Sequence, residues 1–414
     1  MKILWLCNRP LSDSDAGGTG TWLDAMARGL LDSGAVELGI IAPGQVKHFT
    51  RCDYRKVKQW LLPDNRTLGR DGLPPASLVQ AIIAASKEFS PDLVQVWGTE
   101  SFWGLLPSRG LLSCPALLEM QGLKGQIAKV FYGGLTLPEQ LRSIGIKELL
   151  KRRTMRAERR DFARWGLREE EMIRGHRFVD VQTPWLASHI KAINPAARLF
   201  WTDFALRQSF CDADCWQGTA QPTLFCTAAD SSPFKGLHVA IRALGLLKRR
   251  IPDVRLRIAG THQRPGIRQS GYMRWVNRML RKFCLTDAIV WLGPLNAQQI
   301  VAELQNAAAA VIPTFVEGYC LALAEAMRVG TPTVVAYAGG TGHLGKDEES
   351  CLFFPPGDEA MCAYQLERLL IDHGLANRLS DKARAVALIR NDPKMIVANQ
   401  LEIYRQVVST GAGC

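Results

Sequence analysis

Two glutamates, Glu317 and Glu325, flank a predicted junction between a loop and a helix. The apolar run before them, residues 307–313, is typical of a buried parallel strand, and Gly330 with Pro332 is expected to end the helix that carries Glu325. Free backbone N–H groups and the positive end of the helix dipole meet at such a junction and together favour phosphate. The residues expected to surround this anion site are Gly318, Tyr319, Cys320 and Leu321.

The two carboxylates are expected to bind hydroxyl groups rather than the phosphate, because like charges repel and a carboxylate accepts hydrogen bonds from hydroxyls. If the helix begins near Cys320, Glu325 lies roughly 7 Å farther along its axis, at ~1.5 Å rise per residue, and Glu317 lies outside the first turn. A ligand with a sugar on each side of a diphosphate fits this arrangement. A nucleotide sugar is such a ligand.

The segment PTFVEGYCLALAEAMRVGTPTVVA, residues 313–336, resembles the signature of family 4 glycosyltransferases, in which seven residues separate two glutamates. The resemblance implies the GT-B fold, an α/β architecture of two Rossmann-like domains with parallel sheets that face a cleft. It also implies transfer of a sugar from a UDP-, GDP- or ADP-linked donor to a hydroxyl of a glycan or lipid-linked acceptor. Retention of the anomeric configuration, and a role in cell-surface polysaccharide or lipopolysaccharide synthesis, belong to the same expectation. An ordinary βαβ unit with two solvated glutamates is the alternative.

Lys235 and Gly236 precede the first predicted helix of the second half and match a Lys-Gly pair of the family. A Lys at a helix start is unfavourable to the helix dipole, so its presence there favours an anionic ligand. By resemblance, Lys235 neutralises the donor diphosphate and Glu317 contacts the donor sugar near the reacting carbon, which makes these two the catalytic candidates. Glu325 would bind the ribose hydroxyls.

One family feature is missing from the loop before Lys235. Relatives often carry an Arg there, whereas this chain has Ala229 and Asp230 at the matching positions, so either the phosphate site is weaker or another Arg supplies the charge. No Asp-x-Asp motif is suitably placed for a metal ion. We therefore expect metal-independent catalysis and no cofactor, with Lys235 and the helix N-terminus stabilising the departing diphosphate.

The first half contributes three loops at the ends of predicted strands, which is where open α/β sheets bind ligands. Gly17 and Gly18 match the glycine-rich loop that faces the donor diphosphate in the family. Thr99, Glu100 and Gln121 follow the next two predicted strand ends and are candidates for contacts with the acceptor or the donor sugar. Many relatives place a His where Gln121 stands, and Gln cannot transfer protons at neutral pH, so Gln121 is expected only to donate and accept hydrogen bonds.

The chain of 414 residues is long enough for two domains of ordinary size. We expect an acceptor-side domain at residues 1–205, a nucleotide-sugar-binding domain at residues 206–385, and a C-terminal helix at residues 386–414 that packs back on the first domain. The stretch from Asp203 to Pro222 is predicted to be the linker between them.

The formal charge of +12 implies an anionic partner. No nucleic-acid-binding motif accompanies the charge, so nucleic acid is not expected. No apolar run is long enough to span a bilayer, the N-terminus is too short for a signal peptide, and the scattered cysteines suit a reducing compartment. The expected location is the cytoplasm, including the inner face of the plasma membrane.

The most basic segment runs from Lys147 to Arg177 and carries eleven Lys and Arg against six Asp and Glu. Apolar residues in it are predicted to line one face of a helix that rests on an anionic membrane. A solvated surface helix whose apolar stripe packs on the domain is an equal alternative. The residues of this predicted stripe are Leu149, Leu150, Met155, Phe162 and Trp165.

Two other functions remain open for this architecture. One is a relative that hydrolyses or isomerises nucleotide sugars, which would not require an acceptor. The other is a non-catalytic protein that keeps the fold and binds a partner. The Gln at position 121 and the missing Arg favour this second alternative, whereas the intact set of Glu317, Glu325 and Lys235 opposes it.

Overall fold

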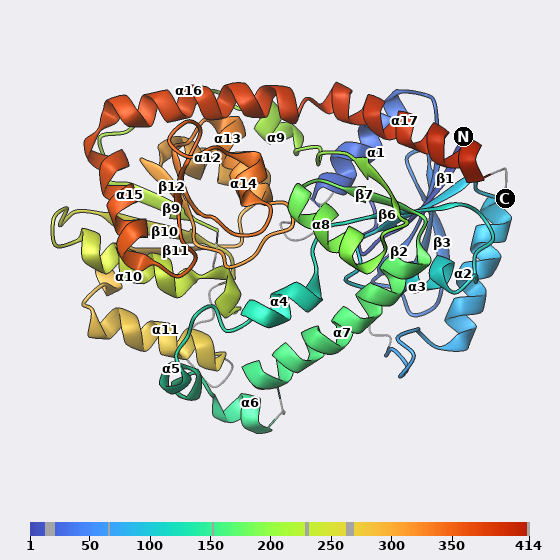
Figure 1. Ribbon diagram of the computed structural model, residues 1–414, viewed down its shortest axis with the longest axis horizontal. Helices are drawn as coiled ribbons and strands as arrows, with labels where there is room; N and C mark the ends of the chain where they lie inside the picture. The colour runs from blue at the N-terminus through green and yellow to red at the C-terminus, as the bar shows by residue number, and fades with distance from the viewer. Residues whose placement is uncertain (13–20, 65–66, 151–152, 228–231, 262–268, 412–414) are drawn as a thin grey trace.

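The computed structural model describes residues 1–12, 21–64, 67–150, 153–227, 232–261 and 269–411. Two sheets lie side by side, each covered by helices on both faces (Figure 1). The first sheet has eight strands in the order β3-β4-β2-β1-β5-β6-β7-β8, parallel except for β3 against β4. Its strands are β1 (Lys2–Leu6), β2 (Glu37–Gly44), β3 (Thr50–Tyr54), β4 (Val57–Pro63), β5 (Leu93–Trp97), β6 (Ala116–Glu119), β7 (Phe178–Val181) and β8 (Arg198–Trp201).

The second sheet has six parallel strands in the order β11-β10-β9-β12-β13-β14. They are β9 (Thr223–Cys226), β10 (Arg255–Ala259), β11 (Ile289–Gly293), β12 (Ala309–Ile312), β13 (Thr333–Ala336) and β14 (Leu352–Phe354). The predicted α/β class with two parallel sheets is confirmed. The chain crosses from one sheet to the other between Trp201 and Thr223.

Most strands with a clear apolar signal in the sequence are buried, although β11 is half-buried along most of its length. The central strands β5, β12 and β13 are apolar throughout or nearly so, as parallel strands covered on both faces require. The strands that were missed are shorter or more polar, and β3 is a half-exposed, antiparallel edge strand. Its sequence, TRCDY, therefore carries little hydrophobic signal.

Helices alternate with the strands in both halves. Those in the first half and the crossing segment are α1 (Trp22–Asp32), α2 (Ala76–Phe89), α3 (Leu105–Ser108), α4 (Lys124–Val130), α5 (Leu137–Arg142), α6 (Ile146–Leu150), α7 (Met155–Gly175), α8 (Pro184–Ile193) and α9 (Gln208–Cys211). The later ones are α10 (Leu237–Leu247), α11 (Gly271–Lys282), α12 (Ala297–Asn306), α13 (Leu321–Val329), α14 (Thr341–Leu344), α15 (Glu359–Ile371), α16 (His373–Arg390) and α17 (Pro393–Gly411).

The C-terminal helices α16 and α17 run along one edge of the molecule, from the second sheet back to the first (Figure 1). The sequence suggested one helical stretch, but Pro393 begins a second helix after a break at Asn391 and Asp392. Helix α17 packs against α1, and the buried Tyr404 hydroxyl accepts a hydrogen bond from Trp5 Nε1 at 3.1 Å. The same hydroxyl donates to Gln95 Oε1, so the helix is anchored in the core of the first sheet.

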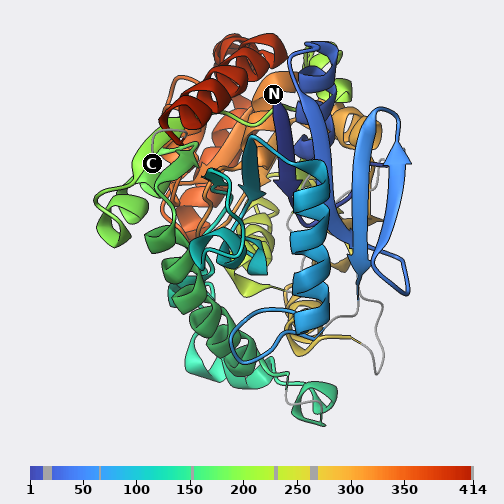
Figure 2. The same cartoon turned by 90° about the vertical axis from the view of Figure 1, so that its right-hand side faces the viewer.

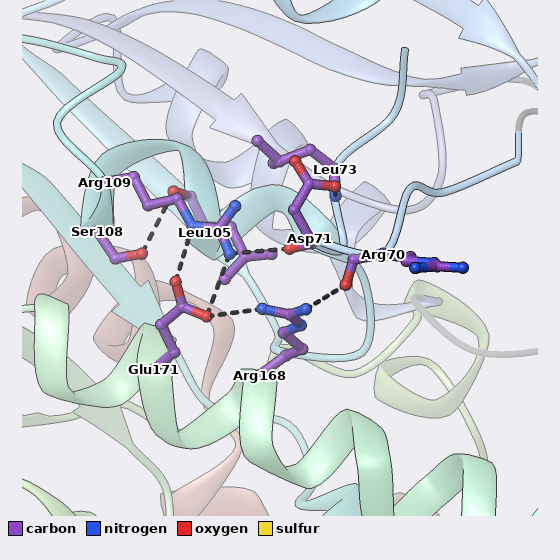
Figure 3. Close-up of polar contacts among 8 residues, drawn as sticks. All are labelled: Arg70, Asp71, Leu73, Leu105, Ser108, Arg109, Arg168 and Glu171. Atoms are coloured by element: carbon purple, nitrogen blue, oxygen red, sulfur yellow. Dashed lines mark hydrogen bonds and ion pairs between the residues drawn. The ribbon is translucent and has the colours of Figure 1, made fainter. Parts of the chain in front are cut away.

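Helix α7 is held to the first half by a cluster of charged side chains around Glu171 (Figure 3). Arg109 donates to both Glu171 oxygens, at 2.7 and 3.1 Å, and Arg168 donates to one of them at 3.2 Å. The two guanidinium groups also donate to the carbonyls of Arg70 and Asp71. One carboxylate thus ties α7 and α3 to the loop before α2.

Candidate active site

Lys235 and Glu317 meet at the end of β12. The ammonium of Lys235 lies 2.8 Å from Glu317 Oε1, and both side chains are partly exposed. Lys235 ends a short 3-10 helix, Pro233–Lys235, and Gly236 follows with φ of 74°. A Cβ at Gly236 would lie 1.8 Å from the Pro313 carbonyl oxygen, so only Gly lets this turn lie against the strand end. The two predicted catalytic residues are therefore brought together.

Helix α13 begins at Leu321 with Cys320 as its N-cap, close to the predicted start. The expectation of a free amide at Leu321 is wrong, because this N–H donates to the Tyr319 carbonyl at 3.1 Å. The Tyr319 side chain also points away from the helix start: its ring packs on Phe204 and its hydroxyl accepts a hydrogen bond from Asn391. The side chain of Cys320 is buried, and burial raises the pKa of its thiol.

Glu325 is buried on α13 and pairs with Arg207, a residue of the segment that joins the two sheets. Burial raises the pKa of Glu325, while the guanidinium of Arg207 acts in the opposite direction. Sequence reasoning missed Arg207, because a single Arg in a linker belongs to no motif. Arg207 is a cation beside Glu325, a carboxylate predicted to bind the donor. It differs from the missing family Arg in its place, because it pairs with the residue predicted to bind the ribose and not with one predicted to bind the diphosphate.

The first half contributes Glu100 and Gln121, whose side chains converge on Gly98. A Cβ at Gly98 would lie 1.9 Å from Glu100 Oε2 and 3.0 Å from Gln121 Cδ. Gly318 lies against the same loop from the other half: its own Cβ would lie 2.3 Å from the Gln121 carbonyl oxygen. The predicted acceptor-side and donor-side loops therefore touch, with Glu317 beside the contact.

The carboxyl group of Glu100 is poorly solvated. Its Oε2 is buried without a hydrogen-bond partner among the described residues, and burial raises the pKa of Glu100 to about 7. Lys124 donates to the Glu100 carbonyl oxygen at 2.7 Å, and burial lowers the pKa of this lysine. Glu169 of α7 accepts hydrogen bonds from Thr99 and from the first amides of α4, which fixes both loops in place. Predicted Thr99 thus has a positioning role.

A cavity of about 740 Å³ lies between α1, the linker, the start of α12 and α17. Residues that line it include Arg9, Thr21, Arg28, Arg207, Ala297 and Val397. Arg207 therefore lies between the cavity and Glu325. Its volume is within the range of about 300 to 1,000 Å³ that is common for small-molecule sites.

Several predicted features lie outside the described residues. These include Gly17 and Gly18 of the glycine-rich loop, and the positions of the missing Arg, Ala229 and Asp230. Within the described ranges, no three His, Cys, Asp or Glu side chains are grouped as a metal site would require. No helix in those ranges combines the length and hydropathy needed to cross a bilayer.

The predicted apolar stripe of the basic segment is divided by the structure. Met155, Phe162 and Trp165 belong to α7 and pack inward: the Phe162 ring lies 5.3 Å from that of Phe131, and Trp165 donates to the Thr99 carbonyl. Leu149 and Leu150 lie on the separate helix α6 and are exposed. A single amphipathic helix is therefore the wrong description, because Thr154 begins a new helix with its own cap.

The second half of the chain is similar to known sugar-transferring enzymes. Residues 218–386 match the family of glycosyl transferases group 1. The uncharacterized glycosyltransferase YqgM of Bacillus subtilis (strain 168) is 28% identical over 182 residues, which are 44% of this chain and 48% of that protein. The chain thus spans about half the length of this curated relative.

Solved structures match over the whole chain. Sucrose-phosphate synthase from Thermosynechococcus elongatus has a TM-score of 0.74 at 16% identity, covering 99% of both chains. HepE of Anabaena, solved in complex with UDP and glucose, has a TM-score of 0.69 at 16% identity, covering 97% of this chain and 98% of its own. At this level of identity the matches define the fold, which is GT-B.

Proposed function

We propose that this protein is a retaining glycosyltransferase of the family 4 type, which moves a sugar from a nucleotide-sugar donor to an acceptor hydroxyl. Two contacts carry the proposal. Lys235 pairs with Glu317, and the neighbouring Gly318 lies against the loop of Gln121, which also approaches Glu100. A cation and a carboxylate of the second half thus lie beside the loops proposed to bind the acceptor. Cell-surface polysaccharide or lipopolysaccharide synthesis is the proposed setting.

The donor nucleotide is proposed to lie along the N-terminus of α13, with its ribose at Glu325 and its diphosphate at Lys235. The cavity is lined in part by Arg207, the partner of Glu325, and its volume is large enough for a nucleoside. UDP is the first candidate, because HepE, of the same fold, was solved with UDP.

The proposed reaction requires the site to stabilise negative charge on the departing diphosphate. Lys235 and the α13 N-terminus supply positive potential there without a metal ion. Glu317 accepts hydrogen bonds from sugar hydroxyls and holds Lys235 in place through their ion pair. Retention requires the acceptor oxygen to bond on the face from which the diphosphate leaves, so donor and acceptor must meet beside Gly318.

The first test is thermal unfolding of the protein with UDP, GDP and ADP, with and without their sugars. A nucleotide at ~100 times its dissociation constant should stabilise the native state by about 2.7 kcal/mol. The shift should be lost in Glu325→Ala and kept in Glu402→Ala, an exposed glutamate on α17. A protein that responds to no nucleotide would contradict the proposal.

The second test separates transfer from the alternatives. With the nucleotide sugar that binds, release of the nucleotide should depend on an acceptor and fall by about 100-fold or more in Glu317→Ala. Release without an acceptor would instead indicate a hydrolase. Tight nucleotide binding with no turnover, unchanged by Glu317→Ala, would indicate a binding protein.

A further inference from the structure

A lobe projects from the molecule next to the second sheet. It consists of residues 137–150 and 153–164, with α5, α6 and the start of α7, together with residues 271–283, which contain α11. The segments are joined because the Gly271 amide donates to Glu148 and Arg278 donates to the Arg142 carbonyl. Both views show α6 at the end of this projection, away from the two sheets (Figures 1 and 2). We call this region the basic lobe.

Large aliphatic side chains are exposed at the end of the basic lobe. On α5, Leu137 is 67% exposed and Leu141 is 60% exposed, and their spacing of four places them on the same side of the helix. On α6, Leu149 is 57% exposed and Leu150 is 80% exposed, and Ile144 between the helices is also exposed. A group of apolar side chains left uncovered on two adjacent elements is a mark of an interaction site.

Most of the excess positive charge of the protein is in the same lobe. Residues 137–150, 153–164 and 271–283 contain eleven Lys and Arg against four Asp and Glu, which gives +7 of the total +12. On the α11 side, Arg278, Arg281 and Lys282 are exposed. Glu139 and Glu148, two of the acids, are already engaged by Arg242 and by backbone amides. The free charge of the lobe is therefore strongly positive.

We propose that the basic lobe docks on an anionic membrane surface, with the α5 and α6 leucines entering the lipid and the surrounding cations facing the lipid phosphates. Exposed aliphatic side chains on a lobe of net positive charge are complementary to both layers of such a surface. A second copy of this chain is disfavoured, because pairing two lobes of this charge brings like charges together. Nucleic acid is disfavoured, because leucines neither stack on bases nor neutralise phosphates.

The test is co-sedimentation of the full chain with vesicles. Binding is expected to vesicles of phosphatidylcholine mixed with phosphatidylglycerol and not to phosphatidylcholine alone, and to weaken in high salt. The double variant Leu149→Glu with Leu150→Glu should lower the partition coefficient by about 100-fold, since burying one leucine contributes about tenfold. Arg281→Ala with Lys282→Ala should lower it by about 25-fold, at about fivefold for each cation.

The matched control is Ile389→Glu on α16, because Ile389 is 80% exposed, as Leu150 is. This variant should bind vesicles like the unchanged protein, and melting curves should be alike for all variants since only exposed side chains change. Equal loss in the control, absence of binding to anionic vesicles, or binding insensitive to the leucines would overturn the proposal. So would gel filtration that shows a dimer which Leu150→Glu dissociates, because the leucines would then be covered by a second copy.

Discussion

Arg207 and Glu325 form an ion pair, with 2.8 Å between Nη2 and Oε1, that joins the linker between the sheets to helix α13. Each side chain is only 11% exposed. Burial raises the pKa of Glu325, and the guanidinium of Arg207 acts in the opposite direction, so the arginine makes it easier to ionise the buried carboxyl group. An ionised carboxylate is the form that accepts hydrogen bonds from hydroxyl groups, so Arg207 is a positioning residue in the proposed donor site.

Replacing Arg207 with Ala is expected to destabilise the protein by about 3 to 5 kcal/mol, because a buried carboxylate loses its partner. The pKa of Glu325 then rises further above its value in the unfolded chain. The folded variant binds this proton more tightly than the unfolded one, so its stability falls as pH rises, and its deficit should be larger at pH 8 than at pH 5. Urea unfolding at both values measures this.

Two further variants serve as controls for Arg207→Ala. Arg207→Lys keeps the charge and should recover part of the stability and of the nucleotide-induced stabilisation. Arg405→Ala removes an exposed pair with Glu402 and should change stability by less than about 1 kcal/mol. If Arg207→Ala behaved like Arg405→Ala at every pH, the buried pair would have no role.

Gly318→Ala is expected to separate the two halves of the site. The new Cβ would lie 2.3 Å from the Gln121 carbonyl oxygen. Its nearest neighbours are all backbone atoms of Gln121 and Gly122, so no flexible side chain can move aside. We expect a loss of about 1 to 3 kcal/mol of stability from overpacking and a fall of about 100-fold in transfer rate from misplacement. Gly245→Ala on α10 is the control, because its nearest neighbour is a leucine side chain at 3.4 Å. A normal transfer rate in Gly318→Ala would show that the contact is dispensable.

The sequence pattern predicted the central strands and α13 well, because buried runs bounded by Gly and Pro carry a strong local signal. The bounds of β12 and β13 and the start of α13 near Cys320 follow from that signal. The meeting of Lys235 with Glu317 was implied only by the family resemblance, since 82 positions separate them along the chain.

The features that sequence reasoning missed depend on tertiary contacts. Arg207 and Glu325 are 118 positions apart, and nothing local marks either as the partner of the other. Phe162 and Trp165 look like part of a membrane-facing stripe in the sequence. In the structure, however, the Phe162 ring packs on that of Phe131, and the Trp165 indole N–H donates to the Thr99 carbonyl. Apolar spacing predicts that a helix has a buried face, but not what buries it.

Glu171→Ala should loosen α7 from the first half, because the guanidinium groups of Arg109 and Arg168 lose their shared acceptor (Figure 3). Charge-assisted hydrogen bonds in a partly exposed cluster support a loss of about 1 to 2 kcal/mol, reduced by salt. The arginines hold the pKa of Glu171 below its usual value, so the stability it contributes is lost as pH falls.

Glu170→Ala is the control for Glu171, since Glu170 pairs only along its own helix with Arg174 and that pair is exposed. Its effect should stay below about 0.5 kcal/mol. Hydrogen exchange in the loop of residues 69–73 gives a local readout, and it should increase in Glu171→Ala alone. Equal exchange in both variants would mean that the loop does not depend on Glu171.

The buried carboxyl group of Glu100 is expected to make the stability of the protein depend on pH. Its pKa of about 7 in the folded protein lies above the ordinary value of 4.5, because burial disfavours the charged form. The folded state therefore holds this proton between those two values while the unfolded state has lost it, and stability falls as pH rises through that interval. Since one unit of pKa corresponds to about 1.4 kcal/mol, the fall is at most about 3 kcal/mol.

Glu100→Gln cannot ionise, so it should gain stability relative to the unchanged protein from pH 5 to pH 8. Other groups, such as Asp180 with a pKa that burial also raises, titrate in both proteins and cancel in the difference. A difference between the two proteins that stays constant with pH would show that Glu100 is ionised and solvated throughout.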